Sequence, residues 1–426
     1  MTEDLLIFLW KNKLYFPETL ILSDGTTIEV VHPGERNNDS GPDFFNTRIK
    51  TGNTIWAGNA EVHVRASDWI RHKHNEDAAF QNVILHIVAE NDAVITNSGG
   101  EEIPTVTIKC DDAILARYHY LLQNTQWVPC AKHIKQIDPF IVTFWLEKLG
   151  IARLESKIND ISAHLGQTQN NWEEVLYRML MRSFGFHLNC LPFEDLAKAL
   201  PYKVLEKHAE SLLHLEALLF GQAGFLNELL PYDDSFTKLQ KEYRYLANKY
   251  NLKAIPRHYW KFLRLRPGNF PTIRLAQVAA LIPNRSKLFT FIKDVQTIPE
   301  LKSIFEVTTS AYWNNHYQFG KVSKEKNKTI GDDSIESIII NSIVPILFIY
   351  GKKTGQEQYQ NKALDFLGQL NPEKNAITDN WIKLGIKPTS AFHTQALLQL
   401  KNFYCDKHRC LECEIGSKIL TNTEKC

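Results

Sequence analysis

Residues 41–65, GPDFFNTRIKTGNTIWAGNAEVHVR, contain the pattern that decides the fold of the N-terminal part. Two apolar-rich runs, Phe44 to Ile49 and Thr54 to Val64, flank Thr-Gly-Asn, a turn signal that predicts a β-hairpin. Further strand patterns lie at residues 20–22, 27–31, 82–89 and 103–108, and a short amphipathic helix is expected at 4–12. The sequence therefore predicts a mixed β-sheet domain over residues 1–125.

The hairpin also gathers acidic and basic side chains. Because residues two apart in a strand share a face, Glu61, His63 and Arg65 are expected opposite the apolar side chains of their strand. Asp43 begins the neighbouring strand and is expected close to Glu61. Two carboxylates held together repel each other, and a bound divalent cation relieves the repulsion. We therefore expect Asp43 and Glu61 to bind Mg²⁺ or Mn²⁺, with His63 as a third catalytic residue.

More titratable residues follow the hairpin. Asp68, His72 and His74 come soon after Glu61, and His86 interrupts the apolar run NVILHIV, so these four are expected around the site. An ordinary structural interpretation fits the same pattern: a turn at Pro42-Asp43, a solvated sheet face, and a hydrogen-bonded core histidine. Histidines and a glutamate on strands are also typical of cupin-like barrels that hold Fe, Mn or Zn, although the segment containing His72 and His74 favours a loop or helix.

The succession of helix, strands, Asp at a strand start and Glu-x-(basic) on the next strand resembles the PD-(D/E)XK nuclease superfamily. The matching positions are Pro42-Asp43 and Glu61-Val62-His63, within a stretch of about 90 residues near the N-terminus. The resemblance implies a restriction-endonuclease-like core in which the two acids bind Mg²⁺ and the basic residue positions or activates the attacking water. His63 stands where the superfamily has lysine, which replaces a constant cation with a titratable imidazole.

Nearly the full chain also resembles an uncharacterised bacterial family known only as a domain of unknown function. The stretches that carry this resemblance are GPDF, WAGNAEVHVRASDWIRHKH, NVILHIV, LRLRPGNFPTIRLAQ and YCDKHRCLECEIG. The resemblance implies a shared fold and brings no activity with it.

Helical patterns replace strand patterns after about residue 110, so the chain is expected to be α+β with a large all-helical region. The expected helices include Phe140 to Asn159, Trp172 to Phe184, Glu206 to Leu219, Phe236 to Lys249 and Ile338 to Tyr350. The polar stretch KVSKEKNKTIGDDS reads as a loop. It divides the helical part into a domain with a basic surface at 126–325 and a C-terminal region at 326–426.

A basic stretch within the helical part points to nucleic acid. Between Glu242 and Asp294 there is no acidic residue but eleven cations, whereas the whole chain has a formal net charge of +1, so the remainder carries about −10. Aromatic residues are interleaved, and cations with stacking faces are typical of nucleic-acid surfaces. The residues expected to bind the nucleic acid are Arg257, Lys261, Arg264, Arg266 and Arg274. Pairing of these cations with acids elsewhere in the fold is the alternative.

The C-terminal stretch YCDKHRCLECEIG places Cys405, Cys410 and Cys413 at C-x4-C-x2-C spacing. Three close thiols predict a structural Zn²⁺ site or an iron–sulfur cluster, and reduced free thiols are the alternative. The fourth ligand is left open among His408, Cys426, Cys130 and Cys190.

The composition predicts a soluble protein of the cytoplasm. Seven cysteines in 426 residues do not indicate a disulfide framework, and the N-terminus lacks the features of a signal peptide. We expect no membrane association, and the oligomeric state is left open. The leading functional hypothesis is a metal-dependent nuclease acting on DNA or RNA. The alternatives are a non-catalytic nucleic-acid-binding protein with a degenerate nuclease fold and a cupin-like metalloenzyme acting on a small molecule.

Overall fold

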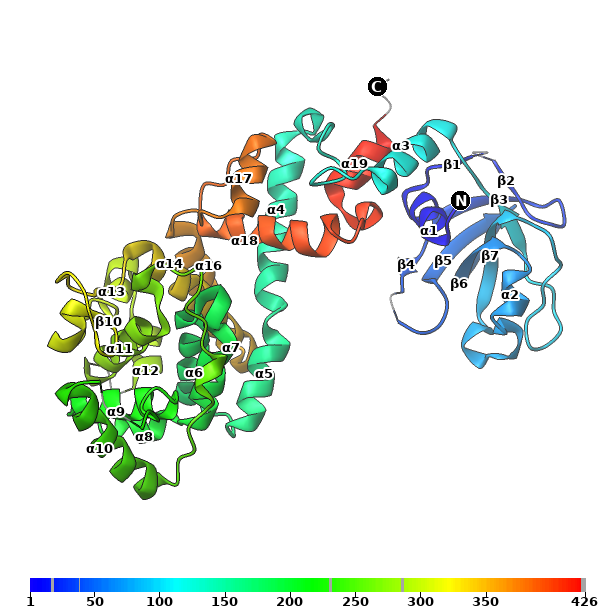
Figure 1. Ribbon diagram of the computed structural model, residues 1–426. Helices are drawn as coiled ribbons and strands as arrows, with labels where there is room; N and C mark the ends of the chain where they lie inside the picture. Colours follow the sequence, from blue (N-terminus) through cyan, green and yellow to red (C-terminus); the bar gives the residue numbers. More distant parts are fainter. Residues whose placement is uncertain (17–18, 38, 230–231, 285–286, 423–426) are drawn as a thin grey trace. The chain divides into compact units, whose positions relative to one another are not determined.

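The computed structural model describes residues 1–16, 19–37, 39–229, 232–284 and 287–422. The chain forms two compact units (Figure 1): unit 1 comprises Met1–Trp145 and Leu400–Cys426, and unit 2 comprises Leu146–Gln399. Unit 1 mixes helices with a sheet, whereas unit 2 is mostly helical. This division differs from the three consecutive regions expected above, because the C-terminal segment joins the N-terminal unit instead of the helices that precede it.

The centre of unit 1 is a seven-stranded sheet with the order β2-β3-β5-β6-β7-β8, in which β4 also pairs with β5. Strands β2 to β6 pair antiparallel, whereas β7 is parallel to both β6 and β8. A parallel neighbour requires a crossover, and the one between β6 and β7 contains α2 (Asp68–Arg71), η1 (His74–Glu76) and η2 (Ala78–Phe80). The strands are β2 (Leu20–Ile21), β3 (Thr27–His32), β4 (Glu35–Arg36), β5 (Phe44–Thr51), β6 (Thr54–Arg65), β7 (Val83–Glu90) and β8 (Thr105–Thr107).

The expected hairpin is formed by β5 and β6, which pair from Thr51 opposite Thr54 to Phe44 opposite Ala60. The register shifts between Phe44 and Thr47, and Asn46 there has a positive φ of 56°. Such a bulge bends the strand and re-aims the residues beyond it. The pairing of Phe44 with Ala60 brings Asp43, the residue before β5, next to Glu61.

The first helix, α1 (Glu3–Asn12), begins where the side chain of Thr2 accepts a hydrogen bond from the amide of Leu5 at 3.3 Å. Its residues from Leu5 to Trp10 are all buried, so it is a core helix rather than a surface one. It contacts β6, as does α2. The C-terminal half of β6 is therefore covered on both faces, and Glu61 and His63 are buried together with Ala60 and Val62.

The rest of unit 1 joins the two ends of the chain. Helix α19 contacts α3, η10 contacts α1, and the rings of Trp145 and Tyr404 lie 5.4 Å apart. The elements are β1 (Tyr15–Phe16), paired with β9 (Lys109–Cys110), followed by α3 (Asp112–Gln123), η3 (Ile134–Gln136), the start of α4 (Pro139–Glu155), the π-helix η9 (Leu400–Cys405), η10 (Cys410–Glu412) and α19 (Glu414–Thr421). The residues of α4 after Trp145 belong to unit 2.

Unit 2 packs its helices around one large apolar core. Among the described residues, one helical run, Asp332–Thr354, is long and apolar enough to cross a membrane, but 78% of its most apolar window is buried in the fold, as in a core helix. A small hairpin of β10 (His316–Gln318) and β11 (Lys321–Val322) interrupts the helices.

The described helical elements of unit 2 are α5 (Ile158–Gln167), α6 (Trp172–Phe184), α7 (Phe186–Ala199), α8 (Tyr202–Glu206), α9 (Leu212–Gln222), α10 (Asp234–Tyr250), η4 (Arg257–Tyr259), η5 (Pro267–Asn269), α11 (Pro271–Leu281), η6 (Ile282–Asn284), α12 (Leu288–Asp294), α13 (Ile298–Ser303), η7 (Ala311–Asn315), α14 (Asp332–Ile338), η8 (Ile339–Ile343), α15 (Val344–Thr354), α16 (Glu357–Gln369), α17 (Ala376–Lys383) and α18 (Ala391–Gln399).

Candidate metal and active site

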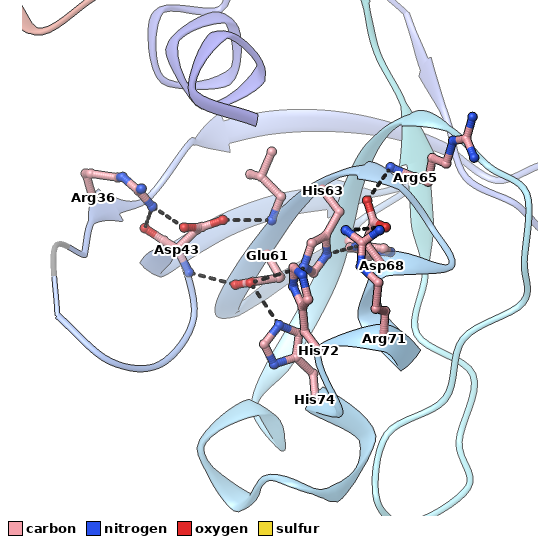
Figure 2. Close-up of polar contacts among 11 residues, drawn as sticks. Arg36, Asp43, Glu61, His63, Arg65, Asp68, Arg71, His72 and His74 are labelled. Carbon is pink, nitrogen blue, oxygen red and sulfur yellow. Dashed lines mark hydrogen bonds and ion pairs between the residues drawn. The ribbon is translucent and has the colours of Figure 1, made fainter. Parts of the chain in front are cut away.

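Asp43 and Glu61 are tied to each other through the backbone of the β5–β6 hairpin. The amide of Asp43 donates to Oε2 of Glu61 at 2.8 Å, and the amide of Val62 donates to Oδ2 of Asp43 at 3.1 Å (Figure 2). Each carboxylate therefore accepts a hydrogen bond from the partner strand, which fixes both side chains where the hairpin meets the crossover. The expected proximity of these two acids is present.

Arg36 is a partner of Asp43 that the sequence analysis did not single out. Its guanidinium donates to the backbone carbonyl of Asp43 at 3.1 Å and forms an ion pair with Oδ1 (Figure 2). Arg36 reaches this position because β4 pairs it with Phe44. A large part of the charge of Asp43 is therefore already balanced by a neighbouring cation.

Glu61 is 6% exposed and faces a set of imidazoles. Its Oε1 lies 3.5 Å from Nε2 of His74 and 3.8 Å from Nε2 of His63. Burial, followed by the charges of Asp43 and Glu3, raises the pKa of Glu61 to about 8. Glu3, at the start of α1, is a further acid near the site. A buried carboxyl group with this pKa needs a proton or a cation beside it at neutral pH.

Three histidines converge next to Glu61. One ring nitrogen from each of His63, His72 and His74 lies within 4.8 Å of the other two. Nε2 of His63 and Nδ1 of His72 are 3.1 Å apart. Nitrogens bound to one ion at bond lengths of about 2.1 Å would have a separation close to this, roughly 3 Å. The 3.1 Å separation therefore fits two nitrogens bound to one ion. It also fits a hydrogen bond between the two imidazoles.

A sharp turn after α2 places the second and third imidazoles. His72 caps the C-terminus of α2, Lys73 has a positive φ of 60°, and His74 begins η1. The left-handed residue reverses the chain, so the two histidines face His63 although neither lies on a strand. His74 stacks on Phe80 with ring centroids 3.8 Å apart, and Trp69 packs edge-on against it. These rings limit the rotation of the imidazole.

His86, on β7, lies behind His63 and holds it. Its Nε2 is 2.8 Å from Nδ1 of His63, and β6 and β7 are adjacent parallel strands. Burial and the neighbouring imidazoles lower the pKa of His63 and of His86 to about 3, so both rings are neutral at physiological pH. Neutral imidazoles are the form that binds metal ions, and a ligand histidine ordinarily donates its second N–H to a partner. His86 is in that partner position.

Asp68, the remaining expected neighbour, has a structural role at the start of α2. It accepts a hydrogen bond from the amide of Arg65 at 3.2 Å and pairs with the guanidinium of Arg71 at 2.9 Å (Figure 2). Its carboxylate is thereby bound by the end of β6 and by α2 itself. Asp68 was expected beside the site because it follows Glu61 closely in the sequence. Its described hydrogen bond and ion pair are with Arg65 and Arg71.

The donor set determines which ions fit. Three imidazole nitrogens converge, and among the described residues no other group of three His, Cys, Asp or Glu is as closely gathered. The carboxylate of Glu61 adjoins two of the three rings, and Asp43 adjoins Glu61. Imidazole ligands suit Mn²⁺, Fe²⁺ and Zn²⁺, whereas Mg²⁺ prefers oxygen ligands and its own waters. The residues therefore fit a transition-metal ion better than Mg²⁺.

A family model described as a protein of unknown function, DUF2851, matches residues 3–376. The chain belongs to this family. The match includes Asp43, Glu61 and all four histidines of unit 1 discussed above, and it ends before the C-terminal cysteines. No curated protein and no solved structure is significantly similar to this DUF2851 chain.

The basic stretch of unit 2 is divided between surface and core. Lys253, Arg257, Lys261, Arg264 and Arg266 are exposed. Among the described cations of this stretch, Arg257 is the one with an acidic ion-pair partner, Glu228, and Arg285 lies outside the described residues. The alternative of general pairing with acids is therefore not what the described residues show.

Arg274, by contrast, is 4% exposed and belongs to the interior. Its guanidinium donates to Gln277 at 2.9 Å, Asn269 at 2.7 Å and Ser334 at 3.1 Å, and it lies over the ring of Phe186. The guanidinium of Arg274 is therefore bound by residues of unit 2. Its expected role at a nucleic-acid surface is therefore corrected to one in packing, because the charged group does not face solvent.

Unit 2 also contains a cleft of about 1550 Å³ that the sequence analysis did not predict. Lys157 lies in its wall, and burial together with the charge of Arg153 lowers the pKa of this lysine to about 8. Acidic side chains such as Asp160 and Glu373 line the same cleft. The mixture of charges selects no class of ligand.

Proposed function

We propose that this DUF2851 protein is a metal-dependent phosphodiesterase acting on nucleic acid, with its active site at Glu61 and the three convergent histidines. The observation that carries the proposal is the meeting of a buried carboxyl group with three imidazoles at the junction of β6 and the α2–η1 crossover. Burial of polar groups is unfavourable unless they are hydrogen-bonded or bind a ligand, and a metal ion would use this arrangement directly.

The topology supports the nuclease assignment. A helix, an antiparallel β3-β5-β6 meander, a short helical crossover and a parallel strand β7 follow one another along unit 1. This succession resembles the core of the PD-(D/E)XK superfamily, with Asp43 before the second strand of the meander and Glu61 and His63 on the third. A cupin-like enzyme fits the donor set, but its barrel of antiparallel strands does not fit the parallel pairs of this sheet.

Each residue of the site has a proposed role. Glu61, His63, His72 and His74 would hold the ion, and Asp43 would bind it directly or orient a water in its shell. The bound ion supplies an activated water and neutralises charge on a phosphoryl oxygen. His86 fixes the ring orientation of His63, and the exposed ring of His72 leaves the site open to solvent and substrate. The exposed arginines and lysines of unit 2 would bind the phosphate backbone.

A non-catalytic nucleic-acid-binding protein is the second candidate, and one observation favours it. Arg36 pairs with Asp43 and weakens the negative charge that a catalytic cation would require. His63 in the place of lysine also removes the constant cation of the superfamily. In this alternative the imidazoles and Glu61 form a structural cluster, and the basic surface remains.

The test is cleavage of fluorescently labelled single-stranded DNA and RNA and of supercoiled plasmid, with Mn²⁺, Mg²⁺ or no added metal. We expect cleavage with Mn²⁺ that Glu61→Gln and His74→Ala abolish, whereas Glu76→Gln, an exposed carboxylate in η1, behaves as wild type. Direct Mn²⁺ binding, measured by electron paramagnetic resonance, should weaken more than about tenfold in the first two variants only. If no metal supports cleavage and the protein still binds nucleic acid in a salt-sensitive way, the non-catalytic alternative is selected.

A further inference from the structure

We propose that Cys130, Cys405, Cys410 and Cys413 together ligate one [4Fe–4S] cluster, which fastens the C-terminal segment of unit 1 to the loop after α3. This site is separate from the proposed hydrolytic centre and does not depend on it. Its basis is the placement of four buried sulfurs from two distant parts of the chain.

Cys130 is brought to the C-terminal cysteines by the fold. Cys130 lies in the turn between α3 and η3, where its carbonyl accepts hydrogen bonds from the amides of His133 and Ile134. It is more than 270 positions before Cys405 in the sequence. All four thiols are nevertheless buried in unit 1. The loop of Cys130 meets the segment of Cys405, because the ammonium of Lys401 lies 5.2 Å from the ring centroid of Trp127, and η9 and η10, which contain Cys405 and Cys410, contact each other. The charges of Cys410 and Cys413 act on both Cys130 and Cys405. Four cysteines meeting inside one small unit are typical of a metal centre.

The other possible fourth ligands are less suitable. His408 is exposed and has a positive φ of 52°, which belongs to the turn between Cys405 and Cys410. Cys110, also in unit 1, is less buried, and its thiol donates to the adjacent carbonyl of Asp111 at 3.3 Å. Cys190 belongs to unit 2, and Cys426 lies outside the described residues. Cys130 is therefore the ligand that the described part of the chain provides.

Cys413 is buried directly before the first turn of α19. Burial raises the pKa of its thiol, while the amides of Ile415 and Gly416, in the first turn of α19, and the indole of Trp145 act in the opposite direction. Gly416 also permits close packing, because a Cβ at that position would lie 2.2 Å from the carbonyl oxygen of Cys410. N–H donors to cysteine sulfurs are a known determinant of the properties of iron–sulfur clusters.

The spacing of the sulfurs distinguishes a cluster from a single ion. A tetrahedral zinc site with Zn–S bonds of about 2.3 Å holds its sulfurs roughly 3.8 Å apart. Within the described chain, the group whose ligand atoms all lie within 4.8 Å of one another is the histidine trio, and no trio of these cysteines satisfies that distance. A [4Fe–4S] cluster attaches each thiolate to a different iron, so it requires the wider arrangement.

The experiment is anaerobic purification of the full chain after expression with iron, followed by iron, sulfide and zinc analysis and an absorption spectrum. We expect about four irons and four sulfides per chain, with absorbance near 400 nm that dithionite bleaches. Cys130→Ser should lose more than about half of the iron, whereas Cys110→Ser should retain it. Circular dichroism establishes whether each variant is folded.

Mössbauer spectroscopy of ⁵⁷Fe-labelled wild type tests the same inference without a variant, since the cluster type is read directly. Stoichiometric zinc with no iron after anaerobic purification would overturn the proposal in favour of a single-ion site. Retention of the full cluster in folded Cys130→Ser would overturn the assignment of the fourth ligand. A chain free of both metals under these conditions would overturn the metal centre altogether.

Discussion

Replacing Glu216 with glutamine should stabilise unit 2, and only at neutral to alkaline pH. Glu216 lies in α9 and is 6% exposed. Its Oε1 accepts hydrogen bonds from the hydroxyl of Ser310 at 2.7 Å and from the indole of Trp313 at 3.1 Å. Burial raises the pKa of Glu216 from 4.5 to about 7, against the opposing effect of these two donors.

The sign follows from proton binding. A carboxyl group whose pKa is higher in the folded chain holds its proton more tightly there, so folding is favoured while the group is protonated. This contribution is complete below pH 4.5 and is lost as the pH rises through about 7. Each pKa unit corresponds to about 1.4 kcal/mol, so the difference between the two limits is about 3 kcal/mol.

Glutamine keeps an acceptor for Ser310 and Trp313 and removes the charge. Relative to wild type, Glu216→Gln should therefore be nearly neutral at about pH 4 and should gain about 2–3 kcal/mol at about pH 8.5. For a unit of this size the gain corresponds to an increase of Tm of roughly 4–12 °C.

The assay is differential scanning calorimetry of wild type, Glu216→Gln and Glu210→Gln at both pH values. Glu210 is exposed, and its substitution should leave Tm unchanged at each pH. The reasoning is refuted if the difference between Glu216→Gln and wild type is the same at both pH values, or if glutamine destabilises the protein at alkaline pH.

Three other perturbations test the site, the basic surface and the C-terminal segment. Arg36→Gln should tighten Mn²⁺ binding severalfold by titration calorimetry, because it frees the charge of Asp43; unchanged affinity would place Asp43 outside the metal site. Gly416→Ala should destabilise unit 1 by roughly 1–3 kcal/mol through its clash with Cys410, while Gly166→Ala, with open space around it, should be neutral or stabilising in the same denaturant titrations. Replacing three exposed cations with glutamine should lower the salt slope of single-strand binding by up to about 2, and an unaltered slope would remove this surface from the interface; the three are Lys261, Arg264 and Arg266.

Local patterns were sufficient to predict the main strands of the unit 1 sheet and several of the longer helices. The β5–β6 hairpin follows from alternating residues around Thr-Gly-Asn, and the expected helix Trp172–Phe184 coincides with α6. The bounds of α9 were less accurate, because the expected start at Glu206 is the last residue of α8, and Ser211 caps a new helix. Period and capping are properties of neighbouring residues, so they can be read along the chain.

The site was only partly predictable, because its remaining members depend on tertiary contacts. Glu61 and His63 follow from the two-residue period of a strand. His72 and His74 join them through the left-handed turn at Lys73. A lysine gives no sequence signal for this conformation. Arg36 arrives through the pairing of β4 with β5.

Two other assignments depended on long-range packing. Arg274 and the exposed arginines before it carry the same charge within one basic stretch, and burial in the helical core is what distinguishes Arg274 from them. Cys130 joins the C-terminal cysteines because the last segment of the chain returns to unit 1. Sequence spacing predicts neither the burial of Arg274 nor the return of the C-terminal segment to unit 1.

The replacement of lysine by His63 is consistent with the other histidines of the proposed centre. A lysine at this position would put a permanent cation beside His72 and His74 and would repel a divalent ion bound by them. A neutral imidazole removes this repulsion and adds a ligand, while Arg36 retains one cation on the far side of Asp43. On this reasoning His63→Lys should not restore a conventional Mg²⁺ nuclease. It should weaken Mn²⁺ binding at least as much as His63→Gln, and Mg²⁺-dependent cleavage by the lysine variant would contradict the proposed arrangement of ligands.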